Sequence, residues 1–251
     1  MFTQVSRSLL CCGLLALCMG SAFGQSAPLQ LAANERLAEQ WVAAQLLQEV
    51  YRRAGLAMII EPLPPARATK ATLSGLKDGE VARIRAYGES NPTLDRVEPA
   101  IYVLTSNAFS LRSRAAEIHR REDLVHYSLG AIRGVAHSSD LTDGHPATTL
   151  TQRADLLFKM LSSRRFDAAL DTGINGRYVI KRQGLTDIQV SADLARYELF
   201  HYLHPKHQAL ASRIGAVITQ MKASGEMDKL IAKAEAGLQN IDLETFTGAS
   251  K

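Results

Sequence analysis

The strongest constraint on the fold is a regular alternation of short apolar segments with amphipathic ones. We expect strands at residues 29–33, 56–61 and 81–85, with helices between them. In the first helical segment Trp41, Ala44, Leu47 and Tyr51 recur at three- and four-residue intervals, and Gly55 follows as a helix-ending residue. Strands that alternate with helices through short connections favour a parallel sheet covered by helices.

The same alternation occurs a second time further along the chain. We expect strands at residues 128–132, 166–170 and 188–190, and helices at residues 150–163 and 175–183. A long extended segment follows each module, at residues 101–111 and 197–203. Two amphipathic helices, at residues 209–222 and 227–235, are expected to complete the chain.

The two extended segments are best explained as crossovers between two α/β lobes. We expect lobe 1 to comprise residues 25–112 and 195–251, and lobe 2 to comprise residues 113–194. The predicted fold is therefore two parallel-core sheets joined by a two-strand hinge. A cleft between such lobes lies at the C-terminal ends of parallel strands, where α/β proteins bind ligands.

Residues 1–24 have the pattern of a cleavable signal peptide. Arg7 provides a positive charge, residues 9–19 form a short apolar run, and Ala22 and Gly24 are the small residues before a mature start at Gln25. An uncleaved anchor is the alternative, although this run is short for a membrane span. The segment predicts an exported protein of an oxidising compartment, the bacterial periplasm.

All three cysteines, Cys11, Cys12 and Cys18, lie in this leader. A mature chain without cysteine has no disulfide, no cysteine nucleophile and no thiolate metal site. A lipoprotein is disfavoured because leucine, not a small residue, precedes Cys11 and Cys18.

Composition excludes several other classes of protein. The 251 residues are 46% hydrophobic and 22% charged, which is too apolar for a disordered chain. The formal net charge is +4, and the basic residues are scattered, so we expect no nucleic-acid partner. Because no second long apolar run follows the leader, we expect no membrane span in the mature chain. We also expect the protein to be a monomer.

Four motifs occur in a characteristic order: GLKDGE at residues 75–80, LGAIRG at 129–134, RFDAALD at 165–171 and MKASGEMDKLIAK at 221–233. With them the chain resembles the type II periplasmic solute-binding proteins of family 3, which include the amino-acid-binding components of ABC importers. The resemblance covers nearly all of the mature chain. It implies a non-enzymatic, cofactor-free protein that captures an amino acid or related amine for an ABC permease.

Two other functions remain open on the same scaffold. One is a stand-alone sensor or interaction protein, since the aromatic loop that the family has after its first strand is missing here. The other is an enzyme similar to the cyclohexadienyl dehydratases, for which Glu35, Arg67 and Arg133 would be available. Fold resemblance does not separate these, because function depends on the site.

Asp171 is the first candidate ligand-binding residue. It follows a predicted buried strand and should lie at the cleft edge, where the resemblance implies pairing with a ligand ammonium group. Capping the next helix is the alternative role. Arg133 ends the first strand of lobe 2, before Gly134, where the family offers backbone N–H groups to a carboxylate, although Val135 replaces the usual hydroxyl residue.

The resemblance also implies an arginine of lobe 1 for a ligand carboxylate. Arg96 is the candidate by order along the chain. Arg67, and Arg83 or Arg85 at the end of the third strand, compete with it. Asn34 and Glu35 follow the first strand at the cleft edge, where an acid favours a cationic ligand. Glu35 could instead complement the dipole of the next helix.

His201, His204 and His207 raise the alternative of a metal site. On a strand, residues three apart face opposite sides, and Pro205 interrupts the path to His207. We therefore expect no metal site here.

Overall fold

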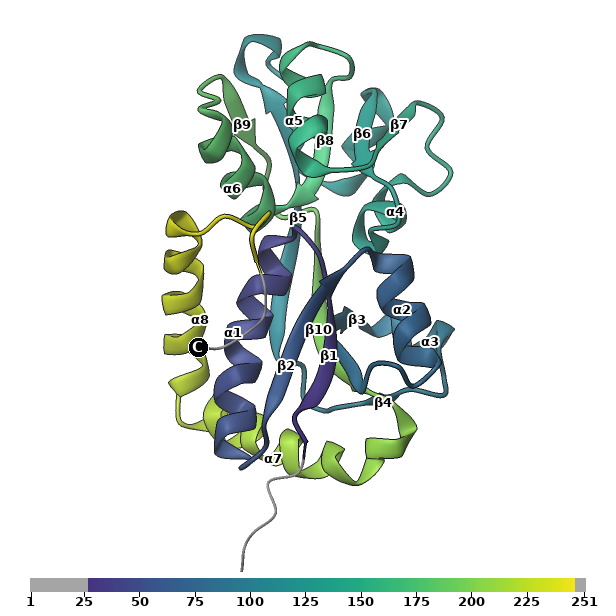
Figure 1. Ribbon diagram of the computed structural model, residues 1–251. Coiled ribbons are helices and arrows are strands. Elements are labelled where there is room, and N and C mark those ends of the chain that lie inside the picture. The colour runs from purple at the N-terminus through teal and green to yellow at the C-terminus, as the bar shows by residue number, and fades with distance from the viewer. Residues whose placement is uncertain (1–26, 247–251) are drawn as a thin grey trace, which may run out of the picture.

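The computed structural model describes residues 27–246, and the predicted signal peptide lies outside them. The described chain forms two α/β halves, one above the other in Figure 1. No helix within residues 27–246 combines the length and the apolar character needed to cross a membrane.

The first half contains three mutually parallel strands, with β1 between β2 and β3. Its elements are β1 (Leu29–Asn34), α1 (Ala38–Arg53), β2 (Met58–Leu63), α2 (Pro65–Leu73), β3 (Gly79–Ile84) and α3 (Arg85–Ser90). The three predicted strands are confirmed to within about two residues at each end. Gly55 has the positive φ of 62° that a residue directly after a helix commonly adopts.

The second half repeats this arrangement, with β6 between β7 and β8 in parallel register. Its elements are β6 (Leu129–Ile132), α4 (Ala136–Thr142), β7 (Thr148–Thr151), α5 (Ala154–Ser162), β8 (Ala168–Thr172), α6 (Gly173–Gln183) and β9 (Ile188–Val190). Short 3-10 turns at Arg112–Arg114 and Arg121–His126 precede them.

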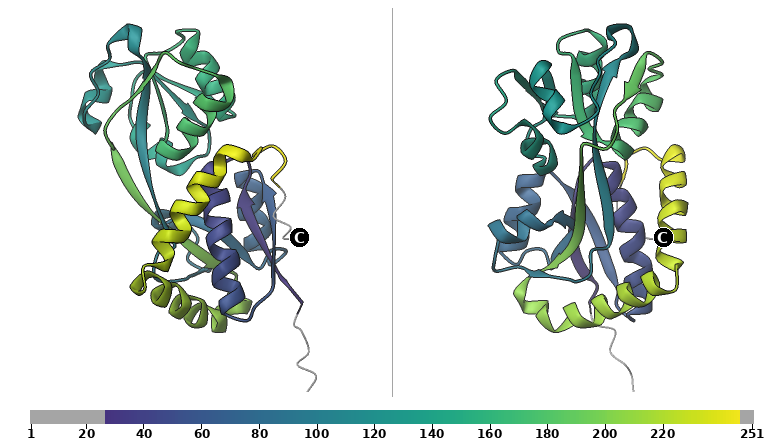
Figure 2. Two further views of the ribbon diagram at one scale, coloured as in Figure 1. Left: turned by 90° about the vertical axis from the view of Figure 1, so that its left-hand side faces the viewer. Right: turned by 180° about the vertical axis from the view of Figure 1, so that it is seen from behind.

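Two long strands connect the halves, as Figure 2 shows from two sides. These are β5 (Tyr102–Leu111) and β10 (Ala195–Leu203), which pair antiparallel from Ala195 opposite Ser106 to Leu199 opposite Tyr102. β10 continues against β3, and β5 continues against β8. The predicted crossovers are confirmed. Through them the two parallel sheets join in one sheet, which has ten strands within residues 27–246. Eight of them follow the order β2-β1-β3-β10-β5-β8-β6-β7, whereas β9 pairs with β5 and the short β4 (Asp95–Arg96) pairs with β10.

After β10 the chain returns to the first half. Helices α7 (Gln208–Ala223) and α8 (Glu226–Gly237) pack against α1, and the two-residue strand β4 (Asp95–Arg96) adds to β10. We call the first half with α7 and α8 lobe 1, and the second half lobe 2. The predicted boundaries at residues 112 and 195 remain a prediction.

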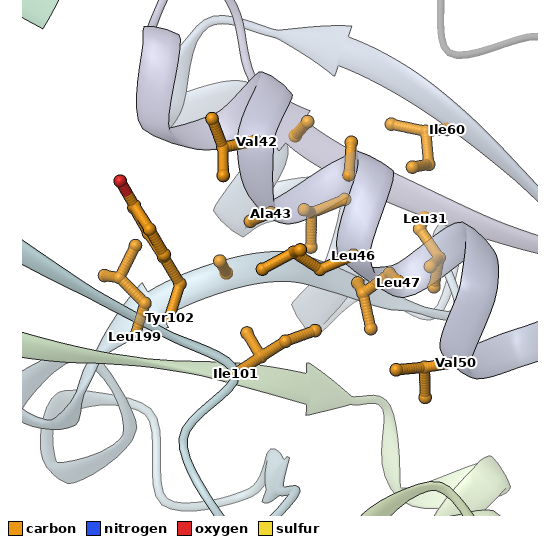
Figure 3. Packing of buried hydrophobic residues seen from close by; sticks show 14 of the residues in the cluster. Leu31, Val42, Ala43, Leu46, Leu47, Val50, Ile60, Ile101, Tyr102 and Leu199 are labelled. Carbon is orange, nitrogen blue, oxygen red and sulfur yellow. The ribbon is translucent and has the colours of Figure 1, made fainter. Parts of the chain in front are cut away.

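Each lobe has a hydrophobic core of its own. In lobe 1 the buried face of α1 presents Val42, Leu46, Leu47 and Val50 to the sheet, where Leu31 and its neighbours meet it (Figure 3). These residues follow one another at intervals of four, one and three positions, which is typical of a helix buried along one face. Each fully buried leucine or valine contributes about 1.5–3 kcal/mol relative to exposure.

The core of lobe 2 forms around α5. Leu157, Phe158 and Leu161 are fully buried, and the Phe158 ring packs edge-on against Phe109 of β5 at 5.2 Å. The predicted helix at residues 150–163 begins too early, because residues 148–151 (TTLT) pair with β6 as β7. Threonine favours extended backbone, and the helix begins only at Ala154.

Adjacent leucines on α5 test this packing. We expect Leu157→Ala to destabilise the protein by about 2–5 kcal/mol, because it leaves a cavity in the core of lobe 2. Leu156→Ala is the matched control, since Leu156 is exposed and its loss should change stability by no more than about 0.5 kcal/mol. Urea unfolding of both variants measures the difference, and equal effects would contradict the register of α5.

Candidate functional site

A cavity of about 280 Å³ lies between the two lobes. Strands β1 and β3 and helices α1, α2 and α3 contribute its lobe 1 wall, and the turn into α4 contributes its lobe 2 wall. The polar or charged side chains of its lining are Asn34, Glu39, Gln40, Thr69, Arg83, Tyr87 and His137. Leu104 of β5 and Leu199 of β10 lie at the hinge side.

Arg83 lies in the lobe 1 wall with its charge already balanced. Its Nε donates to Glu80 Oε2 at 2.6 Å, and a terminal nitrogen donates to Thr69 Oγ1 at 3.1 Å. The guanidinium stacks on Tyr87, whose hydroxyl donates to the other oxygen of Glu80 at 2.7 Å. Because Glu80 is fully buried, this ion pair holds the arginine in the wall.

Asn34 ends β1 and lies in the same wall. Its backbone N–H donates to Gln40 Oε1 at 3.2 Å, and Gln40 in turn donates to the carbonyl of Ala82 at 2.8 Å. The buried side-chain oxygen Oδ1 of Asn34 has no hydrogen-bond partner within the described chain. An unpartnered buried carbonyl oxygen is an acceptor that a ligand donor can satisfy.

His137 faces the cavity from lobe 2. Gly134, with a φ of 76°, makes the left-handed turn that leads into α4 and so places His137 at the cleft. Nδ1 of the ring lies 3.0 Å from Ser106 Oγ, whereas the buried Nε2 has no partner among residues 27–246. Burial lowers the pKa of His137 to about 4, so the ring is neutral at physiological pH.

Two buried carboxyl groups meet beside the cavity, across the lobe junction. Glu39 lies in the first turn of α1, and its Oε2 accepts a hydrogen bond of 3.1 Å from the hydroxyl of Thr172. Asp171 accepts from the backbone N–H of Thr172 and from Asn175 Nδ2, both at 2.8 Å. Burial raises the pKa of Glu39 to about 7, and burial together with the charge of Glu39 raises the pKa of Asp171 to about 8.

The same network links the lobes directly. Thr172 is the N-cap of α6, where its hydroxyl accepts from the N–H of Asn175, and it also donates to Glu39 of lobe 1. Asn175 Oδ1 accepts from the N–H of Ala38 at 3.2 Å. Thr172, rather than Asp171, therefore supplies the helix cap. Asp171 is 1% exposed and lies behind the cavity wall rather than in its lining.

A second cavity of about 300 Å³ adjoins the first. Leu37, Pro65 and Val135 line both cavities and so separate them. Glu35 and Arg133 line this second cavity and not the first. The two cavities together occupy the junction of the lobes.

A charged link crosses the second cavity. Glu244, near the end of the described chain, accepts from Arg36 of lobe 1 at 2.7 Å and from Arg153 of lobe 2 at 2.6 Å. All three side chains are more than a third exposed, so each pair adds little stability on its own.

The structure thus brings only part of the predicted site together. Asn34 and Arg83 line the first cavity, Glu35 and Arg133 line the second, and Asp171 lies behind the wall. Arg67 is exposed on α2. Arg96 lies on β4, where it donates to Glu98 at 2.7 Å and stacks over Phe200, outside the lining of both cavities.

The three histidines considered for a metal make separate contacts. His201 is buried between Tyr51 Oη at 2.8 Å and the carbonyl of Glu80 at 2.7 Å. His204 accepts from the N–H of Lys206, and His207 lies 2.7 Å from Asp78 Oδ1.

Sequence analysis missed Glu39 and His137. An acidic residue in the first turn of a helix is common because it complements the helix dipole, so Glu39 gave no distinct signal. His137 lies on a seven-residue helix that the apolar pattern did not predict. A histidine two residues after the turn at Gly134 and Val135 was the signal that could have indicated it.

The buried acids predict how stability depends on pH. A carboxyl whose folded pKa exceeds its unfolded value stabilises the fold below the unfolded pKa and loses that contribution as pH rises through the folded pKa. His137 and His201, whose pKa values burial lowers to about 4, act in the opposite direction below the ordinary histidine pKa of about 6.5. Above about pH 6.5, the pH dependence of stability from these buried groups therefore comes from Glu39 and Asp171.

We therefore expect the free energy of unfolding of the ligand-free protein to fall by roughly 1–2 kcal/mol between about pH 6.5 and pH 8. Urea unfolding across this range measures the slope. Glu39→Gln and Asp171→Asn should each flatten it, whereas Glu49→Gln, at the exposed end of the same helix, should keep it. An unchanged slope in both cavity-side variants would contradict the buried acid pair.

Comparisons with known proteins agree with this architecture. No family model matches the sequence. A protein of Shewanella oneidensis, described only as uncharacterized, is 25% identical over 186 residues, which cover 72% of this chain and 70% of that one. The substrate-binding protein of an amino acid ABC transporter from Streptococcus pneumoniae, solved bound to L-arginine, superposes with a TM-score of 0.67. It is 18% identical, over 84% of this chain and 95% of that one.

A histidine kinase sensor domain with similarity to periplasmic binding proteins superposes equally well. Its TM-score is 0.69 at 14% identity, over 83% of this chain and 96% of that one. At these identities the likeness concerns the fold. The chain has the two-lobed α/β fold of the periplasmic binding proteins, as the sequence resemblance implied.

Proposed function

We propose that this chain is an exported solute-binding protein that captures a small polar solute, an amino acid or related amine, in the cavity between its lobes. One observation carries the proposal: Asn34 of lobe 1 and His137 of lobe 2 line the same cavity, and each has a buried polar atom, Oδ1 and Nε2 respectively, without a hydrogen-bond partner in the described chain. A buried polar atom without a partner costs about 1–3 kcal/mol, which a ligand bonded to it offsets.

A ligand held from both sides favours approach of the lobes. The lobes are joined by only two strands, β5 and β10, and a solute that contacts both walls stabilises the conformation in which they are close. In an importer an ABC permease would recognise that closed form in the periplasm. The structural likeness to a transporter subunit supports this role, and the likeness to a kinase sensor domain supports sensing as the second candidate.

The arrangement of charged groups favours binding over catalysis. A dehydratase acting on a substrate with two carboxylates needs cationic groups together with a positioned acid. In the first cavity the guanidinium of Arg83 is paired with Glu80, and Arg133 and Glu35 line the other cavity. Among the described residues that line the first cavity, none supplies an unpaired cation beside an acid, as that chemistry requires.

A thermal-shift screen of residues 25–251 against amino acids, polyamines, dicarboxylates and prephenate tests the proposal. A ligand at about 100 times its Kd should stabilise the protein by about 2.7 kcal/mol, equivalent to several degrees in Tm. Asn34→Ala should reduce this shift, and Arg67→Ala, on the exposed face of α2, should retain it. A folded protein that shows no shift with any compound would contradict solute binding. Where a solute does bind, loss of its uptake in cells lacking the protein would indicate import rather than sensing.

A further inference from the structure

The cavity contains an acid that lacks a basic partner. Glu39 is 3% exposed and lines the cavity, and Asp171 lies behind it with 1% exposure. Within residues 27–246 neither carboxyl forms an ion pair, and no basic group contributes to the pKa of either. Buried carboxylates are normally paired with a cation, and otherwise they take up a proton.

The groups that surround Glu39 come from several elements. Asp171 faces it from β8, and the Tyr102 hydroxyl of β5, which donates to Glu235 at 2.6 Å, experiences its charge. Arg177 of α6 also acts on the Tyr102 hydroxyl, but it is not among the groups that shift the pKa of Glu39. His137 of α4 and Arg83 of β3 line the same cavity. Since Arg83 is bound to Glu80 and His137 is neutral, no charge in this set balances Glu39.

The acceptors beside Glu39 are suited to an ammonium group. Asn34 Oδ1, unpartnered and buried, lies in the same lobe 1 wall and can accept a second N–H from a ligand. An ammonium group has three donors and no acceptor, which matches a wall that holds both a carboxyl group and an unpartnered carbonyl oxygen. His137 Nε2 lies on the opposite wall and can bond another polar group of the ligand.

Within the described lining a ligand carboxylate would meet one arginine, whose charge it would have to share. That arginine, Arg83, already donates to Glu80, Thr69 and the carbonyl of Pro65. An additional ligand carboxylate there would share one cation with the buried Glu80, which is unfavourable.

We infer that the cavity selects a cationic amine through Glu39 and Asn34, and that an α-carboxylate on the ligand adds nothing to its affinity. This inference rests on the proposed function and narrows its ligand class. It predicts that the decarboxylated amine binds at least as tightly as the parent amino acid.

Binding of a cation at Glu39 should release a proton. The pKa of Glu39 is raised to about 7 by burial, and a bound ammonium favours the carboxylate and so lowers this pKa. The ligand keeps its own protons, and the carboxyl proton passes to the buffer. Affinity should therefore fall as pH drops below about 7 and level off once Glu39 is ionised in the free protein.

Three matched pairs of probes test the inference: L-arginine with agmatine, L-lysine with cadaverine, and L-ornithine with putrescine. Calorimetry at about pH 6.5, in two buffers with different ionisation enthalpies, gives both the affinity and the number of protons released. We expect the amine of at least one pair to bind as tightly as its parent or more tightly, with release of up to about one proton.

Two variants on the same helix complete the test. Glu39→Gln should weaken binding of the amine by about 10- to 100-fold and abolish proton release, because a charge-assisted bond is lost. Glu49→Gln, which carries the same substitution at the exposed end of α1, should bind like the wild type. The wild-type proton count needs no variant, so the inference stays testable even if Glu39→Gln fails to fold.

The outcomes separate the inference from the proposed function. If the amino acids bind and their decarboxylated partners do not, the protein is a solute-binding protein and this inference is wrong. Amine binding without proton release and without an effect of Glu39→Gln would also overturn it. If neither these probes nor any compound of the wider screen binds the folded protein, the proposed function fails and the inference fails with it.

Discussion

The antiparallel pairing of β5 with β10 is the interaction on which the rest of the structure depends. These strands are the segments that belong to both lobes, and their hydrogen bonds join two parallel three-stranded arrangements into one sheet. Because each lobe has its own core, the pairing is free to act as a hinge rather than as part of a single packed interior. The cavity between the lobes exists because two strands, and not a broad apolar interface, hold them together.

The second determinant is the cost of burying polar groups at this junction. Where the lobes touch, Thr172 and Asn175 satisfy Glu39, Asp171 and the start of α1. At the cavity, Asn34 and His137 each have a buried atom without a partner among residues 27–246. The hydrogen-bonded groups hold the lobes in their orientation, and the atoms without partners are available to a ligand. In lobe 1 these two sets of groups lie close along the chain, because Asn34 ends β1 and Glu39 lies in the first turn of α1.

Much of the fold followed from local patterns. The six strands of the two parallel arrangements, except β7, were predicted from short apolar runs, and the crossovers were predicted from their unusual length. The pattern failed at residues 150–151, which were predicted to begin a helix and instead pair with β6 as the end of β7. It also missed the short helices α3 and α4, whose few turns contain no clear apolar period. The site was predicted less completely: Asn34 and Arg83 line the cavity, whereas Arg96 stacks on Phe200 outside it.

The sequence by itself determined the order of elements, the two lobes and the crossing strands, because each depends on periodicity and on residues close in the chain. It also placed Asn34 and Asp171 at strand ends. Only the tertiary structure decided what those residues do. Glu39 and Asp171 are 132 residues apart in number, yet the charge of Glu39 raises the pKa of Asp171. Likewise, Arg83 is paired with the buried Glu80. Such effects depend on burial and on distances of a few ångströms, which residue order does not encode locally.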